Sequence, residues 1–135
     1  MKHFLIAAAL FGIMPAHAQE AEPKVHPQIL AYAEQRDTVL GQIRFVYAAV
    51  GCGVLWGDGA FQFKVIALQS LDRPAIELSL ADPKLNALDV INTAHKMADV
   101  AASEGVKKAA EPGKCEWFVE HQDVVNDLRE SVGAQ

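Results

Sequence analysis

The sequence predicts an all-α protein, a small bundle of four to six helices closed by one disulfide bond. Three observations favour this fold class. Apolar residues recur at steps of three and four over most of the 135 residues, which is the spacing of one helix face. Clusters of glycine and proline interrupt the pattern and indicate loops between helices. The chain has two cysteines, Cys52 and Cys115, and no convincing pair of strands.

Residues 1–18 are predicted to be a cleaved signal peptide. A short positive start precedes an apolar run from Phe4 to Met14, and Ala16-His17-Ala18 follows as an A-x-A processing site. We expect cleavage between Ala18 and Gln19. The run is shorter than the roughly 20 residues that a membrane-spanning helix needs. Together with the lack of an Asn-x-Ser/Thr glycosylation site, this predicts a soluble protein of the bacterial periplasm.

The mature chain is predicted to be a flexible leader, residues 19–26, followed by a single helical domain, residues 27–133. Pro27 suits a first helical turn, and near-helical apolar spacing continues from there to residue 50. Asp37 is predicted to cap a fresh helix within this stretch. The pattern stops at residues 51–59, where four glycines in nine residues indicate a loop.

Three further elements are predicted before the C-terminus. Residues 60–71 fit either a strand or a helix, and helix is favoured because no second strand is available for pairing. A break at 72–74 precedes a short apolar element. Asp82-Pro83 is predicted to start the clearest helix of the chain, which Gly105 ends or kinks. One final helix is predicted from about residue 114 to 132.

Cys52 and Cys115 are predicted to form a disulfide bond, because two cysteines in an oxidising compartment most simply pair. The bond would join the end of the first long helix to the start of the last. Closing a loop of this length restricts the unfolded chain by about 4 kcal/mol in the loop-entropy model. The alternative is a reactive thiol, which would need a cationic neighbour such as Lys114 to lower its pKa.

The charge pattern bears on the kind of partner. Removal of Lys2 with the signal peptide leaves 11 basic and 17 acidic residues, a net charge of −6. Nucleic acid is therefore not an expected partner, because phosphate binding needs clustered Lys and Arg. Five acidic residues lie at steps of four and three on the predicted last helix: Glu116, Glu120, Asp123, Asp127 and Glu130. They are interpreted either as a site for a basic partner or as a solvated helix face, and a break near His121 would scatter them.

The glycine-rich loop contains a second candidate binding site, Trp56 with Asp58 two residues later. A tryptophan between glycines and close to a disulfide could anchor a partner, because Trp is favoured at interface hot spots. The alternative is that Val54, Leu55 and Trp56 fold back as a lid on the core, since an exposed apolar cluster invites aggregation.

No catalytic or cofactor motif is present: the sequence contains no phosphate loop, HExxH, GxSxG or CxxCH pattern. His95 and Asp99 lie one helical turn apart, but zinc needs three or four ligands and no other is placed beside them. No metal and no other cofactor is therefore predicted. We expect His95 to face the core or to pair with Asp99.

The leading hypothesis is a small non-enzymatic exported protein, of inhibitor, immunity or chaperone-like type, that binds another exported protein. One alternative is a carrier of a small apolar ligand held between helices. A second alternative is an enzyme with scattered site residues, such as His121 with Glu120 or Asp123. A closed apolar cavity on the order of several hundred Å³ favours the carrier, whereas a solid core with Trp56 exposed favours the interaction protein.

Overall fold

The computed structural model describes residues 25–132, which form helices and no strand. The predicted all-α class is confirmed. The predicted signal peptide, its cleavage site at Ala18–Gln19 and residues 19–24 of the predicted leader lie outside this range. The helices are α3 (Pro27–Gly51), α4 (Gly57–Gln69), α5 (Asp72–Ala81), α6 (Ala87–Lys108), α7 (Lys114–Glu120) and α8 (Gln122–Ser131).

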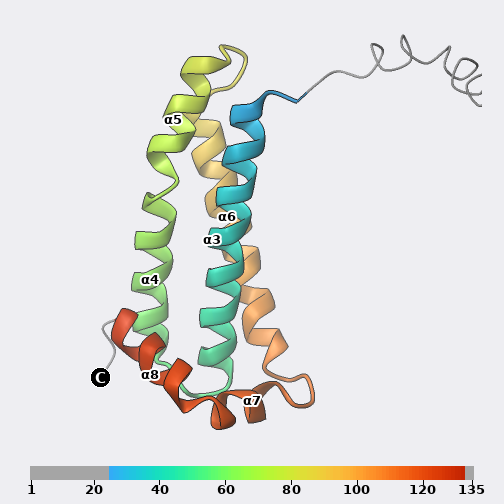
Figure 1. Cartoon of the computed structure of the whole chain (residues 1–135), viewed down its shortest axis with the longest axis vertical. Coiled ribbons are helices and arrows are strands. Elements are labelled where there is room, and N and C mark those ends of the chain that lie inside the picture. Colours follow the sequence, from blue (N-terminus) through green and yellow to red (C-terminus); the bar gives the residue numbers. More distant parts are fainter. Residues whose placement is uncertain (1–24, 133–135) are drawn as a thin grey trace, which may run out of the picture.

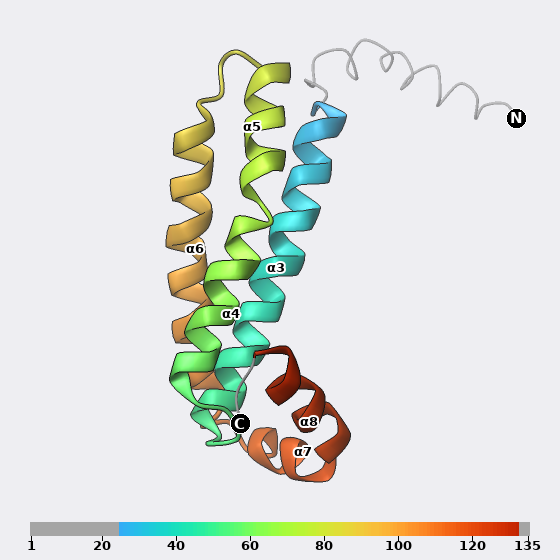
Figure 2. The ribbon, with the colours of Figure 1, turned by 90° about the vertical axis from the view of Figure 1, so that its left-hand side faces the viewer.

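The helices form a three-rod bundle with a cap across one end. Helices α3 and α6 lie side by side, and α4 and α5 follow each other along the third rod (Figure 1). The short helices α7 and α8 lie across the end where α3 finishes and α4 begins (Figure 2). We call this the disulfide end. The opposite end, where α3 and α6 begin and α5 finishes, is called the open end.

The disulfide bond between Cys52 and Cys115 is confirmed, and it closes the bundle as predicted. Cys52 is the C-cap of α3 and Cys115 is the second residue of α7, and their Cα atoms lie 5.3 Å apart. The part of the chain that the structure describes holds no free thiol. The reactive-thiol alternative is therefore wrong.

Small residues allow α3 and α6 to pack closely. The buried residues of α6 are Ala94, Ala98, Ala101, Ala102 and Gly105. A methyl group at Gly105 would collide with the backbone carbonyl of Arg44 on α3. Gly105 was expected to end or kink the helix, and the ending is wrong, because α6 continues to Lys108. Its role is to let two backbones approach each other.

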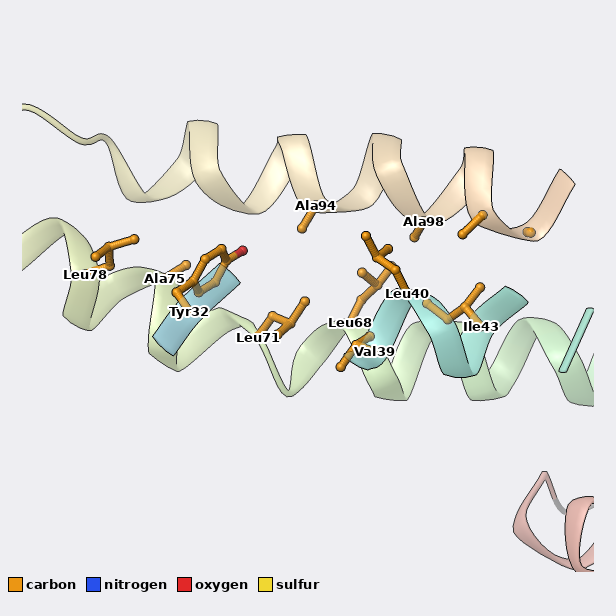
Figure 3. Close-up of a cluster of buried hydrophobic side chains, with 12 residues drawn as sticks. Tyr32, Val39, Leu40, Ile43, Leu68, Leu71, Ala75, Leu78, Ala94 and Ala98 are labelled. Carbon is orange, nitrogen blue, oxygen red and sulfur yellow. The ribbon is translucent and has the colours of Figure 1, made fainter. Parts of the chain in front are cut away.

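Two clusters of buried side chains hold the bundle together. The larger one runs along the three rods and includes Leu40, Leu68 and Leu71 (Figure 3). The second lies at the disulfide end and joins the C-terminal half of α3 to the loop before α4 and to the cap. The cap contributes Phe118, Val125 and Val132 to this second cluster. The cap is therefore part of the core.

Two predicted helix starts are wrong, and one ambiguous segment is resolved. Residues 60–71 are largely helical, as favoured. Asp37 does not cap a helix, because α3 is continuous and the Asp37 side chain pairs with Arg36.

The start of α6 also differs from the prediction. Its N-cap is Asn86, whose side chain accepts a hydrogen bond of 3.1 Å from the backbone N–H of Asp89. Asp82 makes the same kind of bond to the N–H of Lys84, which closes a turn before the helix.

The C-terminal segment is two helices, so the predicted single helix from 114 to 132 is wrong. The break falls at His121, whose backbone leaves helical geometry at φ −119° and ψ 60°. Local side chains replace the lost backbone bonds. The amide of Gln122 donates to the carbonyls of Phe118 and Val119, at 3.2 and 3.1 Å.

Candidate functional site

The loop before α4 divides its apolar residues between core and surface. Leu55 is buried, with 3% of its surface exposed, whereas Trp56 is 72% exposed. Val54 is half-buried against the second cluster. The lid interpretation is therefore right for Val54 and Leu55 and wrong for Trp56, which lies at the N-cap of α4 and faces solvent.

The loop that carries Trp56 is held from three sides. The disulfide fixes Cys52, and the backbone N–H of Val54 donates to the carbonyl of Ala49 at 3.0 Å. The carbonyl of Val54 accepts a bond of 3.0 Å from Nε of Arg129 on α8. Between these contacts Gly53 takes a left-handed φ of 78°, which glycine adopts without strain. Trp56 is thus presented from a well-anchored backbone.

Exposed apolar side chains continue from Trp56 along the third rod. Phe61 and Val65 lie one turn apart on α4, and Ile76 and Leu80 lie one turn apart on α5. On α5 the buried residues Ala75 and Leu78 lie away from this pair. On α4 the exposed apolar residues do not share one face, because Ile66 projects about 140° from Phe61 at 100° per residue. We call these exposed residues the outer apolar edge: Trp56, Phe61, Val65, Ile66, Ile76 and Leu80.

The acidic residues do not form the single stripe that the sequence predicted. Glu116 and Glu120 lie on α7, whereas Asp123, Asp127 and Glu130 lie on α8, beyond the break. All five are exposed, and within residues 25–132 none of them forms an ion pair. Glu116 and Asp123 each lie in a first helical turn, as Asp58 does on α4. Carboxylates there complement the positive end of the helix dipole, which gives these three a local role.

An aromatic cluster that the sequence reasoning missed covers the outside of the disulfide end. The Trp117 and His121 rings stack at 4.0 Å, and Trp117 meets Phe45 edge-on at 5.9 Å. Phe118 lies beneath and is fully buried. The sequence signal for this cluster was the pair of adjacent aromatic residues, Trp117 and Phe118, which begins two residues after Cys115. With Nδ1 of His121 2.7 Å from the Trp117 carbonyl, this cluster stabilises the helix break.

The histidines take part in no metal-binding group in the part of the chain that is described. His95 is exposed and does not face the core, contrary to expectation, and Asp99 pairs with Nζ of Lys64 at 2.7 Å. No group of three metal-binding side chains occurs among residues 25–132. His121 bonds to the Trp117 carbonyl, and no hydrogen bond within the same range joins it to Glu120 or Asp123.

A cleft of about 430 Å³ lies at the open end. It is open to solvent, and its walls come from the first half of α3, the end of α5, the linker before α6 and the start of α6. Leu78, Leu85 and Val90 give it apolar surface, and Arg36 and Lys84 bring positive charge. The sequence reasoning did not identify this cleft, because its residues come from four separate segments.

Tyr32 lies against this cleft with an unsatisfied hydroxyl group. The residue is 7% exposed, and its hydroxyl oxygen has no hydrogen-bond partner among the described residues. Figure 3 shows this oxygen directed toward α6, on the side of Ala94, which lines the cleft. Burial raises the pKa of Tyr32, Arg36 lowers it, and Asp72 raises it further. An unpaired buried hydroxyl costs about 1–3 kcal/mol.

Comparisons with models of protein families, with curated proteins and with solved structures found no match to this chain. The geometry thus offers two candidate sites within residues 25–132. One is the outer apolar edge with Trp56 at the disulfide end, and the other is the cleft at the open end. The first is formed by exposed apolar side chains, and the second is lined by apolar side chains together with Tyr32, Arg36, Lys84 and Asp89.

Proposed function

We propose that this protein is a small exported, non-enzymatic protein that binds another protein of the bacterial periplasm through the outer apolar edge. It would act as an inhibitor, an immunity protein or a chaperone-like protein. The observation that carries the proposal is the 72% exposure of Trp56 beside the buried Leu55. None of the described helices is long and apolar enough to cross a membrane.

The energetics of binding favour this edge over the rest of the surface. Large aromatic side chains dominate interface energies when they enter a pocket on the partner. The loop that leads to Trp56 is fixed at Cys52 by the disulfide and at Val54 by Arg129, so little backbone freedom is lost on binding. Ile76 and Leu80 extend the apolar surface along α5, beyond what a single surface residue provides.

The partner that fits this edge has an apolar pocket for Trp56 and a cationic group close to it. Asp58 lies exposed in the first turn of α4, two residues from Trp56, and no ion pair with a described residue neutralises it. Opposite charge beside an apolar anchor raises the association rate and orients the partner. The net charge of −5 acts in the same direction.

The proposal is tested with Trp56→Ala. The partner is captured from a periplasmic extract and purified, and its Kd is measured by calorimetry against wild type and variant. Loss of a hot-spot tryptophan costs about 2 kcal/mol or more, which weakens Kd about 30-fold. Leu88→Ala is the control, because Leu88 is also apolar and is 63% exposed but lies on α6. An unchanged Kd for Trp56→Ala, with Leu88→Ala also unchanged, would overturn the proposal.

The acidic residues of the cap are assigned a supporting role at the rim of the same interface. Reversing three of them together, with Glu120→Lys, Asp123→Lys and Asp127→Lys, should slow association at low salt and leave the fold intact. Equal association rates for this variant and wild type would restrict the interface to the outer apolar edge.

The cleft at the open end favours the carrier as a second candidate function. The cavity observed is open, whereas a carrier of a wholly apolar molecule would be expected to enclose its ligand. The polar groups around the cleft instead suit a ligand with one charged end, which is argued below.

A further inference from the structure

The cleft at the open end has the dimensions of a small-molecule site and is separate from the outer apolar edge. Its volume of about 430 Å³ falls in the range of ligand pockets in proteins, roughly 300–1,000 Å³. Ile29, Leu78 and Val90 supply apolar contacts from three different helices. A ligand there would need an apolar body of moderate size.

The polar groups at the cleft mostly donate hydrogen bonds. The Tyr32 hydroxyl is buried and unpaired, and it is directed toward the α6 side of the cleft (Figure 3). Arg36 lies one turn further along α3, and its bonds to Asp37 occupy only Nε and one terminal nitrogen. Lys84 forms no ion pair with any residue between 25 and 132. All three groups can donate a hydrogen bond to a ligand atom that accepts one, and the two cationic groups favour an acceptor with negative charge.

The start of α6 adds to this preference. Asn86, the N-cap, and Asp89 and Val90 from the start of the helix line the cleft, so it lies beside the positive end of the α6 dipole. The Asp89 carboxylate is the one acidic side chain among the lining residues. Arg36 and Lys84 outnumber Asp89 among the lining residues, although Asp37 pairs with Arg36, so Lys84 is the cation that we assign to an anion.

We infer that this cleft binds a small monocarboxylate with an apolar body, such as a medium-chain fatty acid or an aryl-substituted acetate. The carboxylate accepts a hydrogen bond from the Tyr32 hydroxyl and lies close to Arg36 and Lys84. The apolar body lies against Ile29, Leu78 and Val90. The Tyr32 oxygen is buried, so this bond requires a small rearrangement of the cleft lining, and the non-helical linker that carries Lys84 and Leu85 is the segment that we assign to it.

The test is an NMR titration of the isotopically labelled protein with octanoate and with phenylacetate. Saturable shifts are expected at backbone amides bordering the cleft, such as those of Ala33, Val90 and Ala94. Octan-1-ol, which has an apolar body like that of octanoate but no charge, should bind at least about tenfold more weakly than octanoate.

Variants connect the binding to the tyrosine. Tyr32→Phe should weaken octanoate binding about tenfold, because it removes the hydrogen-bond donor and keeps the ring. Tyr47→Phe is the matched control, because Tyr47 lies further along α3 and does not line the cleft. Lys84→Gln should weaken octanoate binding and leave octan-1-ol binding unchanged.

Three results would overturn the inference. The first is the absence of saturable shifts at the cleft with either acid at millimolar concentration. The second is equal octanoate affinity for Tyr32→Phe and wild type, and the third is equal affinity for octanoate and octan-1-ol. Trp56→Ala should bind octanoate as wild type does, so this test and the test of protein binding fail independently.

Discussion

The two ends of the bundle are built in opposite ways. At the disulfide end, two extra helices cover the rods, a covalent bond joins α3 to α7, and Phe118 and Val125 are fully buried. At the open end no helix among residues 25–132 covers the rods (Figure 1), and the cleft is lined there by residues such as Leu78. The buried polar group there, the Tyr32 hydroxyl, is left unpaired. The covalent bond and the cap thus lie at the first end, and the cleft with the unpaired hydroxyl group lies at the second.

A small chain can thus combine a closely packed core at one end with an open cleft and an unpaired polar group at the other. A domain of this size has a net stability of only about 5–15 kcal/mol, so an unpaired hydroxyl and an open cleft are affordable only where other contacts compensate. The second core cluster and the disulfide supply that compensation at the far end of α3.

The largest expected effect is the loss of the disulfide. Cys52→Ala with Cys115→Ala releases a loop with a sequence separation of 63 residues, and the free energy of unfolding should fall by about 4 kcal/mol. Urea denaturation followed by circular dichroism measures it. A loss below about 1 kcal/mol would mean that the cap holds the disulfide end without its covalent bond.

Truncation of one buried side chain at each end should give unequal losses. Phe118→Ala leaves a cavity in a fully enclosed site, and a loss of about 3–5 kcal/mol is expected. Leu78→Ala should cost less, about 2–3 kcal/mol, because the cleft beside Leu78 allows the surroundings to relax. Both values come from urea denaturation. Equal losses would show that the two ends are packed alike.

A pair of glycine substitutions tests the close contact between α3 and α6. Gly105→Ala should destabilise by about 1–3 kcal/mol, because the added methyl group meets the α3 backbone. Gly41→Ala is the matched control, since nothing lies within 4 Å of a methyl group there, and it should stabilise by about 0.5–1 kcal/mol. Thermal unfolding of both variants checks the signs. A stabilising Gly105→Ala would contradict the close approach of α3 and α6.

Helix content and the disulfide could be predicted from the sequence because both depend on local or pairwise information. Apolar spacing identified the long helices, and two cysteines left only one intramolecular pairing. Helix ends were less predictable, because several residues compete for them. Asp82 and Asn86 both make the side-chain bonds of a cap, and only packing decides that α6 starts after the second.

The sites were harder to predict because they depend on which segments meet. The sequence pointed to Trp56, but its exposure depends on Leu55 filling the core below it. The predicted acidic stripe required a continuous helix. The helix instead breaks at His121, where the Gln122 side chain takes the place of lost backbone hydrogen bonds. Nothing in the spacing of Tyr32, Leu78 and Val90 indicates that they line one cleft, since each lies on a different helix.

The smallest expected effect concerns the open end itself. Tyr32→Phe removes the unpaired hydroxyl and should raise the free energy of unfolding by about 1 kcal/mol, whereas Tyr47→Phe should change it little. Burial raises the pKa of Tyr32 above its ordinary value of 10.0, so the folded state holds this proton more tightly than the unfolded state.

The stability that this shift contributes is complete below pH 10 and is lost as the pH rises through the folded-state pKa. Wild type should therefore lose stability relative to Tyr32→Phe as the pH is raised above 10, and urea denaturation at several pH values measures the difference. A Tyr32→Phe variant that is less stable than wild type at neutral pH would mean that the hydroxyl is already paired. The open end would then be as well satisfied as the disulfide end.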